Sequence, residues 1–227
     1  MTARICVSIL PKNNLEALSL IETAEKAKAN LIEVRLDCLE SSRNLSDLVK
    51  STKIPLIAAN KLIIEKGFFD GTETERQQTL LSAAKNGFEY VDVDLSSLKL
   101  QETIDKLKPI GAKLIVSFHE YDGVSNVSEM EKILEQEIAC GANVCKIVTK
   151  ATKIEDNLPV LNFVSASSGK SKIVCFCMGE QGKVSRLLSP LFGAFFTFAS
   201  LEQGRETAAG QMAIQEMRAA YKLLEST

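Results

Sequence analysis

KLIVSFHEYDGVSNVSEMEKILEQEIACGANVCKIVT, residues 113–149, contains a complete strand–helix–strand unit. Its two apolar runs, Lys113–His119 and Asn143–Thr149, are rich in Val and Ile and lack proline, as buried strands do. Between them, Val127–Cys140 predicts a helix, and Gly141 stands where a helix end favours a left-handed residue. The stretch therefore predicts two parallel strands joined by a crossover helix.

The same alternation continues in both directions along the chain. Further strands are predicted at Ile5–Leu10, Leu31–Asp37, Pro55–Asn60, Glu89–Leu95, Lys172–Met178 and Gly193–Phe198. Further helices are predicted at Asn14–Ala29, Glu73–Asn86, Ile154–Ser165 and Thr207–Leu224. Eight strands alternating with helices predict a single-domain (β/α)8 TIM barrel over residues 1–227. A doubly wound open sheet is the alternative, but the turn after the first strand, LPKNN (10–14), lacks the glycine-rich phosphate loop of that fold.

Composition excludes several classes of function. The chain has 27 Lys and Arg against 29 Asp and Glu, a net charge of −2, and therefore no basic excess for nucleic acid. The longest uncharged run, between Arg186 and Glu202, is broken by Pro190 and Gly193 and is too short to span a membrane. The first residues carry no secretory signal, so we expect a cytoplasmic protein.

The cysteine and histidine content argues against a metal site or a disulfide framework. Six cysteines are scattered over 227 residues, and the chain has one histidine. The only close pair, Cys175 and Cys177, lies within an apolar run rather than in a zinc-binding CxxC motif. We expect buried, reduced thiols and no metal site.

Charged residues at predicted strand ends mark the candidate site, because the functional residues of such barrels lie at the carboxyl ends of the strands. Glu33, Arg35 and Asp37 alternate at period two in the second strand and should share its inward face. An ion pair that only fills the end of the barrel is the alternative interpretation.

The fifth and sixth strands add a base and an amine. His119, the single histidine, ends its strand, where a general acid–base role is plausible on position alone. Lys146 lies between apolar neighbours in the sixth strand, and a buried amine in this place can attack a carbonyl to form a Schiff base. The alternative is a structural ion pair between Lys146 and Glu33.

Two loops complete the candidate site. CMGEQGKVSRL (177–187) follows the seventh strand, and Arg186 in it could bind an anionic group through its guanidinium fork. TAAGQ (207–211) follows the eighth strand and has the small residues of a loop, with a hydroxyl and an amide.

Taken together and in order, EVRLD (33–37), SFH (117–119), KIV (146–148), MGEQGKVSR (178–186) and GQ (210–211) resemble the type I 3-dehydroquinate dehydratases, aldolase-like barrels of the shikimate pathway. The resemblance extends roughly from Ile5 to Gln211. It implies dehydration of 3-dehydroquinate to 3-dehydroshikimate without a cofactor, and a homodimer. The resemblance is compatible with a role in biosynthesis and with a role in the breakdown of quinate.

The resemblance also implies roles for individual residues. Lys146 would be the Schiff-base lysine, His119 the proton-transfer residue, and Glu65 the acid that steadies the histidine. Substrate contacts would come from Ser8, Glu33, Arg35, Lys61, Arg186, Thr207 and Gln211. Lys61 and Thr207 depart from the family's usual Arg and Ser. With Glu65 raising the pKa of His119 and burial lowering it, we expect activity to fall on the acid side between about pH 5 and 7.

Two rival functions share these residues. An aldolase of the transaldolase kind would also use Lys146 but needs a phosphate site after strands seven and eight. A non-catalytic barrel that binds small acids would use Lys146 only as an ion-pair partner.

Overall fold

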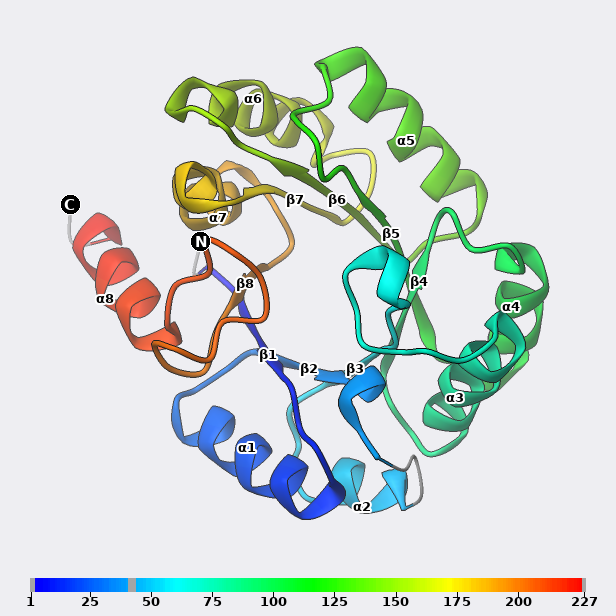
Figure 1. The fold of residues 1–227 in the computed structure, drawn as a ribbon. Helices are drawn as coiled ribbons and strands as arrows, with labels where there is room; N and C mark the ends of the chain where they lie inside the picture. The colour runs from blue at the N-terminus through cyan, green and yellow to red at the C-terminus, as the bar shows by residue number, and fades with distance from the viewer. Residues whose placement is uncertain (1–2, 41–43, 226–227) are drawn as a thin grey trace.

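The computed structural model describes residues 3–40 and 44–225, and its strands form a barrel surrounded by helices (Figure 1). The strands are β1 (Ile5–Ile9), β2 (Leu31–Arg35), β3 (Leu56–Ala59), β4 (Tyr90–Asp94), β5 (Lys113–His119), β6 (Val144–Lys150), β7 (Ile173–Met178) and β8 (Thr197–Ala199). They pair in parallel in the order β7-β6-β5-β4-β3-β2-β1-β8. The predicted (β/α)8 barrel is confirmed.

The register of the sheet brings the polar residues of neighbouring strands to one level. Ser8 of β1 pairs with Glu33 of β2, and Ser117 of β5 pairs with Lys146 of β6. Among the described residues no ladder joins β7 to β8, so the barrel has one seam. A backbone hydrogen bond from Phe195 N to Ile173 O, 2.7 Å long, joins the two chain segments at the base of this seam.

Eight α-helices flank the strands of the described chain. They are α1 (Asn14–Lys26), α2 (Leu45–Lys50), α3 (Glu73–Lys85), α4 (Leu100–Leu107), α5 (Val127–Ala139), α6 (Asn157–Ser167), α7 (Lys183–Leu188) and α8 (Ile214–Glu225). Side-chain caps begin three of them: Asn13, Thr72 and Asn126 each accept a backbone hydrogen bond from the first turn of α1, α3 and α5. The predicted left-handed residue after α5 is confirmed, with φ +83° at Gly141, and Gly87 after α3 has the same conformation with φ +99°.

Alternation along each strand divides the core into two layers. On β2, Leu31 belongs to a cluster inside the barrel, whereas Ile32 and Val34 pack in the cluster between sheet and helices. Glu33 and Arg35 therefore share the inward face with Leu31, as their spacing predicts. Apolar side chains fill the lower part of the barrel, and charged ones gather at its carboxyl end.

Three predicted boundaries are wrong. Asp37 lies in a 3-10 turn, Leu36–Cys38, that ends β2 early. Gly193 has φ +107° and ends another 3-10 turn, so β8 begins only at Thr197. The last helix begins at Ile214, because the preceding segment returns over the barrel mouth as a loop with Gly210 at φ +79°.

No helix in the described ranges is long and apolar enough to cross a membrane.

Candidate active site

A cavity of about 270 Å³ opens at the carboxyl ends of the strands. Nine of the ten residues for which we predict a role line it: Glu33, Arg35, Lys61, Glu65, His119, Lys146, Arg186, Thr207 and Gln211. Ser8 lies behind this lining, where its hydroxyl donates to Glu33 Oε1 at 2.6 Å. The structure therefore brings the predicted residues together in one place, although they come from four strands, from helix α7 and from the segments after β3 and β8.

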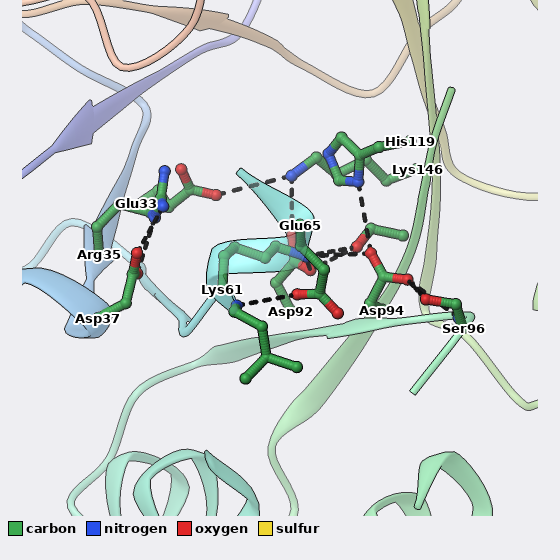
Figure 2. Close-up of polar contacts among 12 residues, drawn as sticks. Glu33, Arg35, Asp37, Lys61, Glu65, Asp92, Asp94, Ser96, His119 and Lys146 are labelled. Atoms are coloured by element: carbon green, nitrogen blue, oxygen red, sulfur yellow. Dashed lines mark hydrogen bonds and ion pairs between the residues drawn. The ribbon is translucent and has the colours of Figure 1, made fainter. Parts of the chain in front are cut away.

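Asp92 of β4 is buried beneath this cavity, where it forms a floor that two of the lining lysines share (Figure 2). Lys146 Nζ donates to Asp92 Oδ2 and Lys61 Nζ donates to Asp92 Oδ1, each at 2.8 Å. Ser117 Oγ donates to the same Oδ1 at 2.7 Å. Burial alone would raise the pKa of Asp92, but the two ammonium groups hold it well below its usual range. Asp92 is therefore a buried, fully charged carboxylate.

His119 stands at the end of β5 beside a second carboxylate of β4 (Figure 2). Its Nδ1 lies 3.5 Å from Asp94 Oδ2, and Ser96 holds the other oxygen of Asp94 through its hydroxyl at 2.6 Å and its backbone N–H at 3.0 Å. Burial lowers the pKa of His119 to about 4; Asp94 opposes this effect, and Lys61 and Lys146 add to it. The imidazole is therefore neutral at pH 7. Because Nδ1 faces Asp94, Nε2 is the nitrogen left to accept a proton.

Glu65 takes a different place from the one predicted. Arg76 of α3 is almost wholly buried and donates to both oxygens of Glu65, at 3.2 and 3.1 Å. The predicted contact between Glu65 and His119 is wrong, because this buried guanidinium attracts the carboxylate and Asp94 stands beside the imidazole instead. Glu65 still lines the cavity, and burial raises its pKa. Of the two opposing effects that we expected on the pKa of His119, burial, which lowers it, is therefore the larger.

The cluster on β2 is an ordered network. Arg35 donates twice to Asp37, at 2.9 and 2.6 Å, and Asp37 also accepts the backbone N–H of Phe68 at 3.0 Å. Glu33 Oε2 lies 3.8 Å from Lys146 Nζ, farther than Asp92 does. The ion pair between Lys146 and Glu33 therefore exists, but it is the weaker of the two around this lysine.

In the part of the chain that the structure describes, no acidic side chain forms an ion pair with Arg186. Arg186 lies in α7, is 1% exposed, and stacks 4.2 Å over the ring of Phe176. Its Nε has no hydrogen-bond partner among the described residues. Burial lowers the pKa of Arg186 to about 9, which still leaves it charged at neutral pH. A buried guanidinium facing a cavity in this state is set to receive an anion.

The two predicted residues of the loop after β8 bind each other. Gln211 Nε2 donates to Thr207 Oγ1 at 2.8 Å, and Thr207 N donates to Gln211 Oε1 at 2.7 Å. The loop touches the one after β7, where Gly179 N donates to Ala209 O at 2.9 Å. The ideal Cβ of a residue at position 210 would lie 2.1 Å from Gly179 O, so only glycine fits there.

Sequence reasoning missed three residues of the site. Asp92 and Asp94 have the same period-two spacing as the residues of β2, so inward-facing carboxylates on β4 could have been inferred in the same way. Tyr121 lines the cavity beside His119, with its ring nearly parallel to the imidazole and its hydroxyl donating to Glu65 O at 2.7 Å. Nothing in the spacing of Tyr121 indicates that contact.

Comparison with known proteins points in one direction. A family model described as type I 3-dehydroquinase matches residues 5–227. A 3-dehydroquinate dehydratase of Dehalococcoides mccartyi is 36% identical over 203 residues, 88% of this chain and 89% of that protein. One from Methanococcus maripaludis is 31% identical over 223 residues, 97% of this chain and 100% of that protein. The crystal structure of the 3-dehydroquinate dehydratase from Geobacillus kaustophilus superposes with a TM-score of 0.89 at 21% identity, over 100% of this chain and 92% of that one.

Proposed function

Because the chain belongs to the type I 3-dehydroquinase family, we propose that it dehydrates 3-dehydroquinate through a Schiff base on Lys146. The activity follows from the family: it is a carbon–oxygen lyase reaction of the shikimate pathway, releasing water and 3-dehydroshikimate. The assignment of the chemistry to individual side chains is our proposal.

The charges of the cavity support an acidic substrate. Arg35 is bound to Asp37 and both lysines are bound to Asp92, so three of the cations already have anionic partners. Arg186 has none among the described residues, and it lines the same cavity. We assign the substrate carboxylate to Arg186, with Gln211 and Thr207 closing over it from the loop after β8.

The reaction then runs in four steps. The Lys146 amine attacks the C3 ketone, and loss of water gives an iminium that draws electrons from C2. His119 Nε2 takes the C2 proton, and the electron pair of that C–H bond forms an enamine. The enamine expels the C1 hydroxyl, which the His119 imidazolium protonates to water, and hydrolysis of the iminium returns the free lysine and the enone product. Every proton that His119 removes is given back within the cycle, so no co-reactant is needed.

One observation carries this proposal. A lysine that is 5% exposed and a histidine that burial keeps neutral face the same small cavity, across from a guanidinium that lacks an anion. A base must be unprotonated to accept the C2 proton, and this histidine meets the condition over the whole neutral range.

Reductive trapping tests the assignment. Incubation with 3-dehydroquinate and borohydride should add the mass of one reduced adduct to the enzyme and place it on Lys146. Lys146→Ala should lose both the adduct and turnover. Lys150→Ala is the matched control, because Lys150 ends the same strand but is exposed, and it should retain both. An adduct on another lysine would overturn the assignment, and turnover without an adduct would refute the Schiff base.

We also propose that the active form is a cytoplasmic homodimer. Light scattering coupled to gel filtration should give twice the chain mass of 24.8 kDa. A monomeric mass at full activity would refute the dimer.

A further inference from the structure

Lys61 lines the cavity, but its ammonium is hydrogen-bonded to side chains of β4 and β5. Its ammonium donates to Asp92 Oδ1 at 2.8 Å and to Ser117 Oγ at 2.9 Å, and it lies 3.7 Å from Asp94 Oδ2. An ammonium has three N–H groups; two of these donate to Asp92 and Ser117, and Asp94 lies within ion-pair distance of the charge. The residue is 7% exposed, and its charge is paired with the buried carboxylate of Asp92.

The acceptor that Lys61 uses is also the one that holds Lys146. Asp92 is buried, and its two oxygens are divided between two ammonium groups, Oδ1 for Lys61 and Oδ2 for Lys146. We infer that Lys61 is a positioning residue that acts on Lys146 through Asp92. By satisfying much of the charge of Asp92, it weakens the hold of that carboxylate on the Lys146 proton and favours the free amine. This inference rests on the proposed Schiff base.

Among the other groups of the described chain that face Lys146, none is a cation bound to Asp92. Those that face it from the remaining elements are Glu33 of β2, His119 of β5, the Cys6 thiol of β1, the Phe198 ring of β8 and, across the cavity, Arg186 of α7. Glu33 is an anion and favours the ammonium. At neutral pH the histidine and the thiol are uncharged, because burial lowers the pKa of His119 to about 4 and raises that of Cys6.

Removing Lys61 therefore changes the balance around Lys146 in one direction. The amine would face Asp92 with no second cation on that carboxylate, and Glu33 would still lie 3.8 Å away. Both carboxylates would then hold the proton that the amine must lose before it attacks a ketone. A substrate contact predicts a different outcome: weaker binding with an unchanged dependence of imine formation on pH.

The experiment measures the rate of imine formation as a function of pH. Single turnovers of 3-dehydroquinate are quenched with borohydride, and the fraction of enzyme that carries the reduced adduct is measured by mass spectrometry. Lys61→Met removes the charge and retains most of the stem; Lys61→Gln also removes the charge but retains a donor for Asp92. Lys61→Arg retains the charge. Lys66→Met is the matched control, because Lys66 lines the same cavity but its ammonium lies over the Tyr121 ring, 5.8 Å from the centroid.

We expect Lys61→Met and Lys61→Gln to form the imine about tenfold more slowly at pH 7 and to recover as the pH rises, which moves the midpoint of the profile up by about one unit. KM should change less than about threefold, and Lys61→Arg and Lys66→Met should retain the wild-type midpoint. A raised KM with an unmoved midpoint would overturn the inference and make Lys61 a substrate contact.

The proposed function and this inference fail in different ways. If the wild-type enzyme yields no adduct, or yields it on Lys61, the Schiff base on Lys146 is refuted. If the wild-type adduct lies on Lys146 and both charge-removing variants retain its pH profile, only the inference about Lys61 is refuted. Thermal unfolding followed by circular dichroism establishes that each variant is folded. If Lys61→Met does not fold, Lys61→Gln is the variant in which the pH profile is measured.

Discussion

The chain has one histidine, so its titration can be followed without assignment in a spectrum of the whole protein. Burial lowers the pKa of His119 from 6.5 to about 4, a shift that corresponds to about 3 kcal/mol in favour of the neutral ring. The perturbation is Asp94→Asn, which removes the carboxylate 3.5 Å from Nδ1 and leaves a side chain of the same size. Because an anion at that distance favours the imidazolium, its removal must lower the pKa further.

The distance sets the size of the effect. Two unit charges 3.5 Å apart attract by about 1 kcal/mol in the dielectric of water and by about 5 kcal/mol at an effective dielectric of 20. The His119 side chain is 16% exposed, which places it between these limits and toward the second. The lower limit already moves the titration by nearly one unit. We therefore expect a midpoint near pH 4 in the wild type and at about pH 3 or below in Asp94→Asn.

The assay follows the carbon-bound proton resonances of the imidazole by NMR from pH 2 to 8, beside kcat/KM from pH 3 to 8. Asp94→Asn should also lower kcat at pH 7, since the ring loses the group that orients it. Asp105→Asn, an exposed substitution on α4, is the control and should leave the midpoint unchanged. A wild-type midpoint between pH 6 and 7, or a midpoint that rises in Asp94→Asn, would refute the reasoning.

Three further predictions concern other parts of the site. Arg186→Lys retains the charge but loses the guanidinium fork, so calorimetry should show substrate binding about 10- to 100-fold weaker; unchanged affinity would make Arg186 structural. Glu65→Gln should leave the titration midpoint of His119 within about half a unit of wild type, because Arg76 and not His119 is the partner of that carboxylate; a larger shift would restore the contact predicted from the sequence. Gly210→Ala forces a Cβ into a carbonyl at φ +79°, and chemical denaturation should show a loss of about 1–3 kcal/mol of stability, whereas an unchanged midpoint would mean that the loop rearranges freely.

The sequence predicts the barrel because each strand is apolar, short and separated from the next by a helical pattern. Inward placement of Glu33 and Arg35 follows from period two alone, and the same argument, applied to β4, would have found Asp92 and Asp94. The last helix was predicted too long because the alanines after Thr207 favour a helix, whereas closure over the barrel mouth requires a turn at Gly210.

Other features depend on tertiary contacts that no local pattern reports. Glu65 follows Lys61 at the spacing expected of the acid beside the histidine, yet its direction is decided by Arg76, which arrives from α3. Lys61 is likewise drawn to the floor by Asp92, one strand away. A single sequence shows which residue types are present in such networks. Which acidic and basic side chains form ion pairs depends on how the fold places them.

The seam between β7 and β8 bears on how the molecule opens in solution. Amides along these two edges lack the ladder that protects the other strands, so hydrogen exchange by local opening should begin there. Arg186 follows one edge and Gln211 the other, and a hydrogen bond from Thr197 Oγ1 to Arg186 O, 2.6 Å long, already joins the two sides. A carboxylate held by both residues would bridge the seam, so saturating ligand should slow exchange there more than elsewhere in the barrel. At a hundredfold excess over Kd, that protection amounts to about 2.7 kcal/mol.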